Sequence, residues 1–98
     1  MFRATALDPM ATDSAESAYC FVYVLGCLTN RGYRTYVGWT VDLERRLAQH
    51  NNGTGAKFTR GHTWILLYAE QYPSRREAMA REWHLKRDRR FRKQLRQE

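Results

Sequence analysis

Five polar side chains occupy positions where the sequence pattern otherwise predicts apolar, core-facing surfaces. They are two tyrosines, an arginine, a histidine and a carboxylate: Tyr23, Tyr36, Arg46, His50 and Glu82. Hydrolysis of a phosphodiester requires stabilisation of the negative charge that develops at phosphorus, a base for the attacking water and help for the leaving oxygen. The set contains a candidate for each of these tasks.

Arg46 and His50 lie four residues apart on a predicted helix, so their side chains converge on one side of it. At about 100° per residue, His50 falls on the apolar face that Leu43 and Leu47 define and Arg46 lies at its border, whereas Arg45 faces water. A lone histidine on such a face is more often a core residue with satisfied hydrogen bonds, and a lone arginine is more often a surface charge. The spacing of the two favours a joint role.

Glu82 lies on a second predicted helix, inside an apolar arc that Leu85, Ala78, Met79 and Trp83 form. A carboxylate directed at a core is costly unless it is paired with a cation or binds a metal ion. A salt bridge to one of the many arginines is the simpler explanation. The functional explanation is that Glu82 holds one divalent metal ion whose remaining ligands are waters.

Tyr23 and Tyr36 lie on two predicted strands of one hairpin, where their side chains share a face. Tyrosine pairs on sheets are usually packing pairs, but buried hydroxyls require hydrogen-bond partners. Positive charge from Arg46 and a bound metal ion lowers the pKa of a neighbouring tyrosine. A tyrosine base, helped by His50, then predicts a cleavage rate that still rises through about pH 8–9. The sequence does not decide which of the two tyrosines is the base.

Composition and charge indicate a single folded domain that meets a polyanion. The chain has 98 residues, a formal net charge of +7 and 13% aromatic residues. That length excludes a second catalytic domain, a dinucleotide-binding fold and an eight-stranded barrel. A basic folded domain most often binds nucleic acid, although a basic surface also serves solubility. The apolar runs are too short to span a membrane, so no membrane association is expected.

The cysteines indicate the compartment. Cys20 and Cys27 are separated by a strand-like run that would place their Cα atoms about 23 Å apart, too far for a disulfide. We therefore expect free thiols and a location in the reducing cytoplasm.

The elements that must position these side chains follow from periodicity and turn signals. The fold class expected is α/β (α+β), a three-stranded antiparallel sheet flanked by helices in the order β-β-α-β-α. The expected elements are strand 21–25, turn 29–32, strand 33–39, a helix from Thr40 or Asp42 to His50 or Asn51, a glycine-rich basic loop 53–63, strand 64–70 and a basic helix 75–90. Residues 1–18 are expected to be a flexible leader, residues 19–93 the domain and residues 94–98 a tail.

The sequence resembles the GIY-YIG nucleases, in particular their small stand-alone bacterial branch. Phe21-Val22-Tyr23 and Tyr36-Val37-Gly38 resemble the paired tripeptides, and the run to Asn51 is similar to the continuation of that motif. The basic loop around Lys57 and the segment from Tyr72 to Trp83 resemble later motifs. Phe21 replaces the glycine of the first tripeptide, and Trp39 stands where excision-repair relatives carry lysine. The resemblance covers about residues 19–90.

The resemblance implies roles for individual residues. Tyr23 and Tyr36 match the motif tyrosines, Gly38 the glycine beside the site, Arg46 the catalytic arginine and His50 a position held by His or Tyr. Glu82 matches the single metal-binding glutamate, which Mg²⁺ or Mn²⁺ serves in that family. The expected DNA-binding residues are Lys57, Thr59, Arg60, Arg75 and Lys86.

The function expected is therefore that of a metal-dependent DNA endonuclease, with structure-selective cleavage in repair or recombination. One alternative is a nucleic-acid-binding module on the same fold with weak catalysis. Another is a subunit that acts only with a protein partner. The sequence gives neither the oligomeric state nor the substrate preference.

Overall fold

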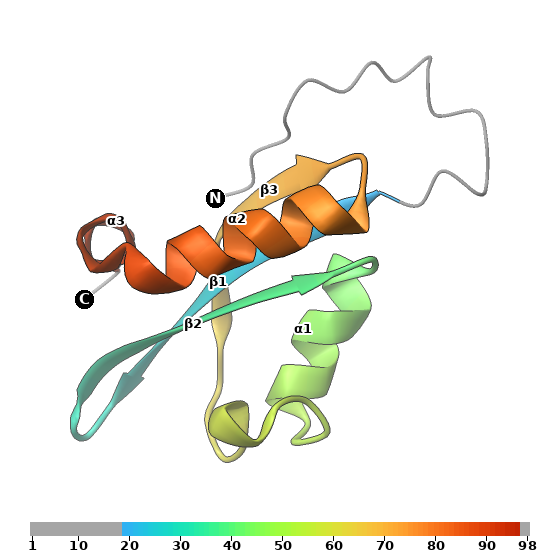
Figure 1. The fold of residues 1–98 in the computed structure, drawn as a ribbon. Helices are drawn as coiled ribbons and strands as arrows, with labels where there is room; N and C mark the ends of the chain where they lie inside the picture. Colours follow the sequence, from blue (N-terminus) through green and yellow to red (C-terminus); the bar gives the residue numbers. More distant parts are fainter. Residues whose placement is uncertain (1–18, 97–98) are drawn as a thin grey trace.

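A computed structural model describes residues 19–96, and in it a three-stranded antiparallel sheet carries helices on both faces (Figure 1). The sheet order is β2-β1-β3, so β1 is the central strand. The elements are β1 (Cys20–Thr29), β2 (Gly32–Thr40), α1 (Leu43–Asn51), the 3-10 turn η2 (Lys57–Thr59), β3 (Ile65–Tyr72), α2 (Arg75–Arg87) and α3 (Arg89–Gln94). The expected fold class and the order β-β-α-β-α are confirmed. The expected leader, residues 1–18, lies outside the described residues.

The β1–β2 hairpin closes at the predicted turn. Its register runs from Phe21 opposite Thr40 to Thr29 opposite Gly32. The hydroxyl of Thr29 accepts a hydrogen bond from the backbone N–H of Arg31 at 3.1 Å and donates one to the carbonyl of Gly32 at 2.8 Å. Gly32 has a φ of 113°, a conformation that favours glycine.

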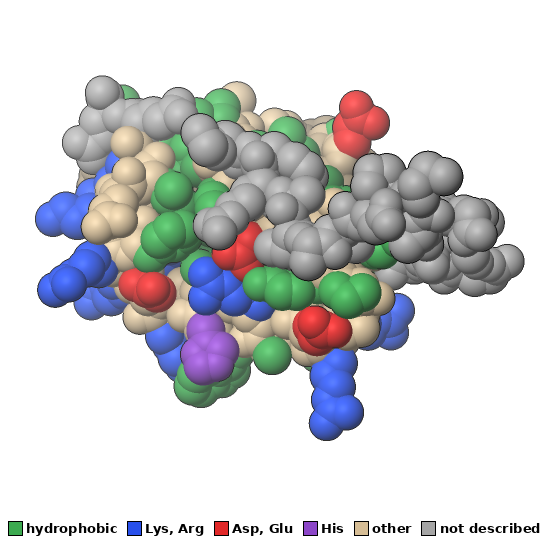
Figure 2. Space-filling view, turned by 90° about the horizontal axis from the view of Figure 1, so that it is seen from above, with side chains coloured by type: hydrophobic (Ala, Val, Ile, Leu, Met, Phe, Trp, Pro, Cys, Tyr) green, Lys and Arg blue, Asp and Glu red, His purple; other side chains and the backbone are tan. Residues whose placement is uncertain are grey.

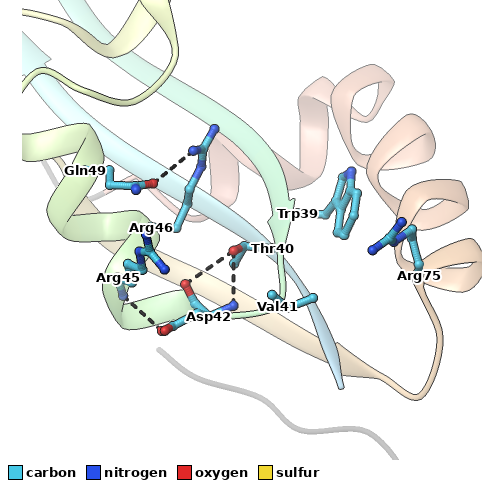
Figure 3. A pocket seen from close by; sticks show the side chains of 8 residues that line it. All are labelled: Trp39, Thr40, Val41, Asp42, Arg45, Arg46, Gln49 and Arg75. Atoms are coloured by element: carbon cyan, nitrogen blue, oxygen red, sulfur yellow. Dashed lines mark hydrogen bonds between the residues drawn. The ribbon is translucent and has the colours of Figure 1, made fainter. Parts of the chain in front are cut away.

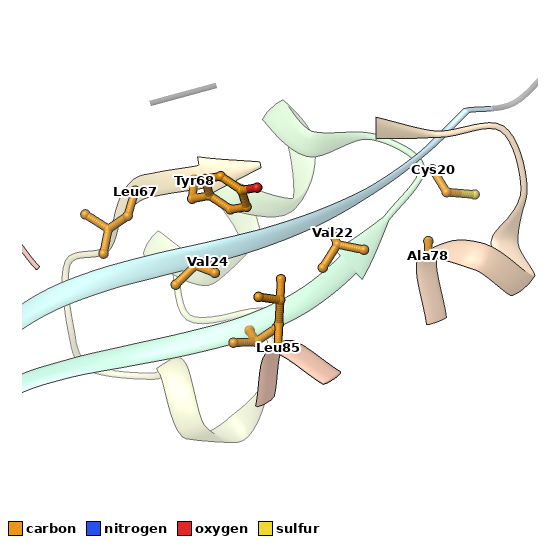
Figure 4. Close-up of a cluster of buried hydrophobic side chains, with 8 residues drawn as sticks. Cys20, Val22, Val24, Leu67, Tyr68, Ala78 and Leu85 are labelled. Carbon is orange, nitrogen blue, oxygen red and sulfur yellow. The ribbon is translucent and has the colours of Figure 1, made fainter. Parts of the chain in front are cut away.

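Alternate residues of β1 enter two separate cores. Val22 and Val24 face α2 and pack with Leu85 and Ala78 (Figure 4). Tyr23 and its neighbours on the other face pack with Leu43 and Leu47 of α1. Because both faces of β1 are covered, its sequence is apolar throughout rather than alternating. The polar candidates lie in the core on the α1 side.

The predicted basic helix 75–90 is wrong in its length. The chain leaves α2 at Arg87, and Asp88 begins α3 by accepting a hydrogen bond from the backbone N–H of Phe91 at 3.0 Å. At the other end of α2, Ser74 caps the helix as predicted, since its hydroxyl accepts a hydrogen bond from the N–H of Glu77 at 3.2 Å.

The apolar arc expected on α2 is also narrower than predicted. Ala78 and Leu85 are fully buried, but Met79 is 48% exposed and Trp83 is 53% exposed. The sheet face that α2 covers accepts only the narrow stripe that includes Ala78 and Leu85. Glu82 therefore lies beside the core instead of within it.

The thiols of Cys20 and Cys27 are both free, and they lie in different cores on opposite faces of β1. In the part of the chain that the structure describes, no helix has the length and apolar character needed to cross a bilayer.

Candidate active site

The hydroxyl of Tyr23 lies at the heart of the candidate site, over the backbone of the neighbouring strand. Tyr23 is opposite Gly38 in the β1–β2 register. A Cβ atom built on Gly38 would lie 2.5 Å from the Tyr23 hydroxyl oxygen, closer than such atoms pack. Gly38 is therefore required so that the side chain of Tyr23 can cross β2 at this point.

The hydroxyl of Tyr23 contacts the ring of His50. His50, in the last turn of α1, is fully buried, and its Nε2 lies 2.8 Å from the Tyr23 oxygen. Its other ring nitrogen, Nδ1, lies 2.8 Å from the hydroxyl oxygen of Thr59. The histidine is thus held between two hydroxyl groups.

The position of Thr59 assigns the direction of these hydrogen bonds. The Thr59 hydroxyl donates to the carbonyl of Ala56 at 2.7 Å, so its oxygen is left to accept from Nδ1–H of His50. Nε2 is then the unprotonated nitrogen, and it accepts a hydrogen bond from Tyr23. A directed chain of hydrogen bonds runs from Tyr23 through His50 and Thr59 to the loop backbone.

The expectation that Thr59 contacts DNA is corrected by this arrangement, because its exposed fraction is 0%. The loop is closed around it by Trp64, whose indole N–H donates to the carbonyl of Thr59 at 2.8 Å. The side-chain amide of Asn51 accepts a hydrogen bond from the backbone N–H of Trp64 at 2.6 Å and donates one to its carbonyl at 3.0 Å. Gly55 packs so closely on His50 that a Cβ there would lie 2.6 Å from Nδ1. These residues support the site from inside.

Burial sets the pKa values of the pair. It raises the pKa of Tyr23 to about 12, although the guanidinium of Arg46 acts in the opposite direction. Burial also lowers the pKa of His50, and the positive charge of Arg46 adds to this effect. Near neutral pH the pair is therefore a neutral tyrosine that donates to a neutral histidine. The expectation of a readily formed phenolate is not supported by these surroundings.

Arg46 lies on the side of α1 that faces the site, and Arg45 is exposed, as the helical wheel predicts. The guanidinium of Arg46 donates a hydrogen bond to the side-chain oxygen of Gln49 at 3.0 Å. Both arginines border a pocket of about 320 Å³ between α1 and the start of α2 (Figure 3). On the far side of that pocket Arg75 stacks over the ring of Trp39, with 5.5 Å from guanidinium carbon to ring centroid.

Glu82 reaches the site from α2, on the other face of the sheet. Its side chain is 21% exposed, and its carboxylate lies 3.4 Å from Nζ of Lys86. The charge of Glu82 contributes to the raised pKa of Tyr23, after burial and the neighbouring Tyr36. The carboxylate is thus paired with a lysine one turn away and is still accessible at the edge of the site.

Tyr36 adds an aromatic wall. Its ring centroid lies 5.0 Å from that of His50 and 6.4 Å from that of Tyr23. Phe58 of η2 stacks on its outer side, with centroids 6.0 Å apart and planes inclined by 22°. The structure therefore brings both motif tyrosines to one face, and the hydroxyl that contacts His50 belongs to Tyr23.

A second polar cluster was not found by sequence reasoning. Glu70 of β3 is 5% exposed, and it accepts hydrogen bonds from the hydroxyls of Tyr68 and Tyr72 and from Arg81. Burial alone would raise the pKa of Glu70, but the bonds from Arg81 and the tyrosines outweigh it and hold the pKa below 4.5. Tyr68, Glu70 and Tyr72 alternate along β3 on one face, which was the available signal.

The remaining basic residues expected to contact DNA are on the surface. Lys57 and Arg60 flank the buried Thr59 on the loop, and Arg75 and Lys86 are exposed on α2. The face seen in Figure 2 mixes Lys and Arg side chains with acidic and hydrophobic ones, so this view shows no uniformly basic surface.

The protein side chains alone do not form a complete metal site, so a divalent ion would also need oxygen ligands from substrate and water. Among residues 19–96 no group of three or more His, Cys, Asp or Glu side chains is arranged to hold a metal ion. Mg²⁺ commonly binds through one or two carboxylates, waters and substrate phosphate oxygens. The carboxylate of Glu82, which is 21% exposed, could provide one protein ligand for an ion of this kind.

Comparison with known proteins identifies the family. Residues 19–95 match the family model described as the GIY-YIG catalytic domain. A UPF0213 protein of Clostridium perfringens is 45% identical over 67 residues, which are 67% of this chain and 69% of that protein. A UPF0213 protein of Halobacterium salinarum is 47% identical over 66 residues, 66% of this chain and 82% of that protein. The solution NMR structure of a UPF0213 protein from Bacillus halodurans is 39% identical, with a TM-score of 0.46 over 79% of this chain and 81% of that one.

Proposed function

The chain belongs to the GIY-YIG catalytic domain family, and we propose that it is a divalent-metal-dependent DNA endonuclease that hydrolyses phosphodiester bonds. The observation that carries this proposal is the hydrogen-bond chain from Tyr23 through His50 to Thr59. The chain begins at the hydroxyl of Tyr23, which experiences the charges of Arg46 from α1 and of Glu82 from α2. A merely structural tyrosine–histidine pair would not require that combination.

We assign the role of proton acceptor to the Tyr23–His50 pair. The attacking water gives its proton to the oxygen of Tyr23 while Tyr23 passes its own proton to Nε2 of His50. With a pKa of about 12, Tyr23 forms very little free phenolate near neutral pH, so transfer to His50 replaces that costly intermediate. Nδ1–H of His50 stays bonded to Thr59, which keeps the ring in the accepting tautomer.

Arg46 and Glu82 have complementary roles in this proposal. The guanidinium of Arg46 donates to the phosphate oxygens, where charge increases in the transition state. Glu82 would hold the divalent ion, Mg²⁺ or Mn²⁺, which supplies further charge stabilisation to the phosphate when bound. Lys86, which pairs with Glu82 at 3.4 Å, would have to release that carboxylate when the ion binds.

The setting of the activity is part of the proposal. We place the enzyme in the reducing cytoplasm, because both buried cysteines are free thiols. We further propose that it selects DNA by structure in repair or recombination.

One observation favours a second candidate function. The Glu82 carboxylate already has a cation partner in Lys86, as it would in a module that binds DNA without cleaving it. A domain that cleaves only with a protein partner would present the same arrangement when alone.

The proposal is tested with purified protein and end-labelled duplex, flap, branched and single-stranded DNA. We expect cleavage with Mg²⁺ or Mn²⁺, none with EDTA, and none from Glu82→Gln, which should still bind DNA. Glu44→Gln, an exposed carboxylate on the outside of α1, is the matched control. DNA binding without cleavage under every metal condition would support the binding module instead. Cleavage by Glu82→Gln at the wild-type rate would show that Glu82 is not the metal ligand.

A further inference from the structure

A second cationic groove lies at the end of β2 that is remote from Arg46. Its volume is about 360 Å³, and α3, β2 and the turn η2 enclose it. Within the described residues no Asp or Glu lines it. Its basic lining residues are Arg34, Arg89, Arg92, Lys93 and Arg96.

The break at Asp88 creates this groove. After the break, Arg92 points back and donates to the carbonyls of Leu85 and Lys86 at 3.1 and 2.8 Å, and to the hydroxyl of Thr35 at 2.9 Å. Through these hydrogen bonds, Arg92 holds α3 against α2 and β2. The carboxylate of Asp88, the acidic side chain closest in sequence, is engaged in capping α3.

The groove contains more basic side chains than Arg92, which makes the hydrogen bonds that hold α3 in place. Burial lowers the pKa of Arg92, and the neighbouring charges of Arg89 and Arg96 lower it further, whereas Asp88 acts in the opposite direction. Arg34, from the opposite wall, adds another cation and lies over the ring of Phe58 at 5.7 Å. A surface that served solubility alone would separate like charges, whereas a polyanion site gathers them.

The groove is continuous with the proposed active site. A smaller pocket of about 210 Å³ shares Thr35, Phe58 and Arg92 with it and extends to Tyr36. From Arg34 to Gly38 the strand advances by about 13 Å at 3.3 Å per residue. Phosphates along one strand of a duplex are about 3.4 Å apart in axial rise, so this span corresponds to roughly four nucleotides.

We propose that this groove is a second phosphate-binding subsite, which holds the DNA backbone about four nucleotides away from the phosphate that is cut. The position of the cut rests on the proposed function, whereas binding of backbone phosphates by the groove does not. Arg89 and Lys93 contact the phosphates, and Arg92 keeps α3 in place beside β2. The half-exposed ring of Phe58 lines both the subsite and the smaller pocket that leads to Tyr36.

The test compares two double charge reversals with equal changes in net charge. Arg89→Glu/Lys93→Glu alters the groove and leaves Arg92 intact. Arg31→Glu/Arg76→Glu alters exposed arginines on the hairpin turn and on α2, outside the groove. Binding of a fluorescein-labelled 20-base-pair duplex is measured in EDTA at several salt concentrations. Thermal melting checks the fold, and Arg89→Gln/Lys93→Gln serves as a milder variant.

We expect the groove variant to weaken binding by tenfold or more at about 0.1 M salt. The slope of log K against log salt should fall by roughly 1.8, which corresponds to two lost phosphate contacts. The control variant should change the slope by less than half of that. Equal losses in the two variants, or an unchanged slope in the groove variant, would overturn the subsite.

Cleavage kinetics separate this inference from the proposed function. In an active enzyme, the groove variant should raise KM and leave kcat unchanged, because the subsite binds the ground state and the transition state equally. If wild-type protein binds DNA without cutting it and the groove variant loses binding, the nuclease proposal fails and the subsite stands. If wild-type protein cuts DNA and the groove variant binds like the control, the subsite alone fails.

Discussion

The hydroxyl of Tyr23 and Nε2 of His50 are 2.8 Å apart in the fully buried interior between β1 and α1. Gly38 leaves the space for that hydroxyl, and Thr59 fixes the protonation of the histidine ring. Each partner alone is a weak choice of base, because burial raises the pKa of the tyrosine and places the histidine out of contact with solvent. In the proposed mechanism they act together, so that a proton passes from the attacking water to Tyr23 as Tyr23 passes its own proton to His50.

The pH dependence of cleavage follows from these pKa values. His50 must be neutral to accept a proton, and burial lowers its pKa from 6.5. The active form therefore increases as the pH rises through a value below 6.5 and is complete above it. Because Tyr23 ionises only near pH 12, we expect a plateau from about pH 7 to pH 9. Single-turnover rates across this range check it, and a tenfold rise per pH unit would contradict it.

Thr59 should act through the histidine. Thr59→Val keeps the shape of the side chain but removes the hydroxyl, so His50 loses the group that selects its tautomer. We expect a loss in kcat of roughly 10-fold to 100-fold and a change in the pH profile, with little change in KM. Thr59→Ser should restore most of the activity. A valine variant with the wild-type rate and profile would show that Thr59 is only a packing residue.

The two adjacent arginines of α1 should differ strongly. Arg46→Ala removes a donor that faces the site, and its cleavage rate should fall by about 10²–10³-fold. Arg45→Ala alters an exposed side chain at the rim of the same pocket and should lose less than about threefold. Rates for both variants at saturating DNA decide this. The reverse order would mean that Arg45, and not Arg46, contacts the reacting phosphate.

Glu70 should contribute to stability in a pH-dependent manner. Its folded-state pKa is below its ordinary value, so its contribution is present above about pH 4.5 and is lost as the pH falls through the folded-state pKa. Glu70→Gln should cost about 2–4 kcal/mol at pH 7, less than a fully buried pair because a third of the Arg81 side chain is exposed. Urea unfolding at pH 7 and pH 3 measures it. A stability difference that does not narrow at pH 3 would contradict the assignment.

Periodicity located much of the fold and several site residues. The apolar face of α1 placed His50 inward and Arg46 at the border, and alternation along the strands placed Tyr23 and Tyr36 on one face. These inferences succeed because a regular element fixes the direction of every side chain that it carries. The glycine at position 38 could be placed opposite Tyr23 only once the register was known.

Other features depend on contacts between elements, which no local pattern encodes. Thr59 lies in an irregular loop. Its buried position depends on Trp64, whose indole donates to the carbonyl of Thr59 and whose own carbonyl accepts from the side chain of Asn51. Glu70 of β3 accepts a hydrogen bond from Arg81, which lies eleven residues later on α2. The break at Asp88 was missed because Phe91 is the one apolar side chain in residues 86–94, so no apolar period marks where α2 ends and α3 begins.

The most direct test of the coupled Tyr23–His50 pair is a double-mutant cycle on the single-turnover cleavage rate. The cycle compares wild-type protein with Tyr23→Phe, His50→Ala and the double variant, with circular dichroism to confirm that each is folded. We predict that each single change costs about 10²-fold or more, and that the double variant loses little beyond either one, because groups that act as a unit are strongly non-additive. Losses that multiply in the double variant, or a Tyr23→Phe enzyme that cuts at the wild-type rate, would contradict the account.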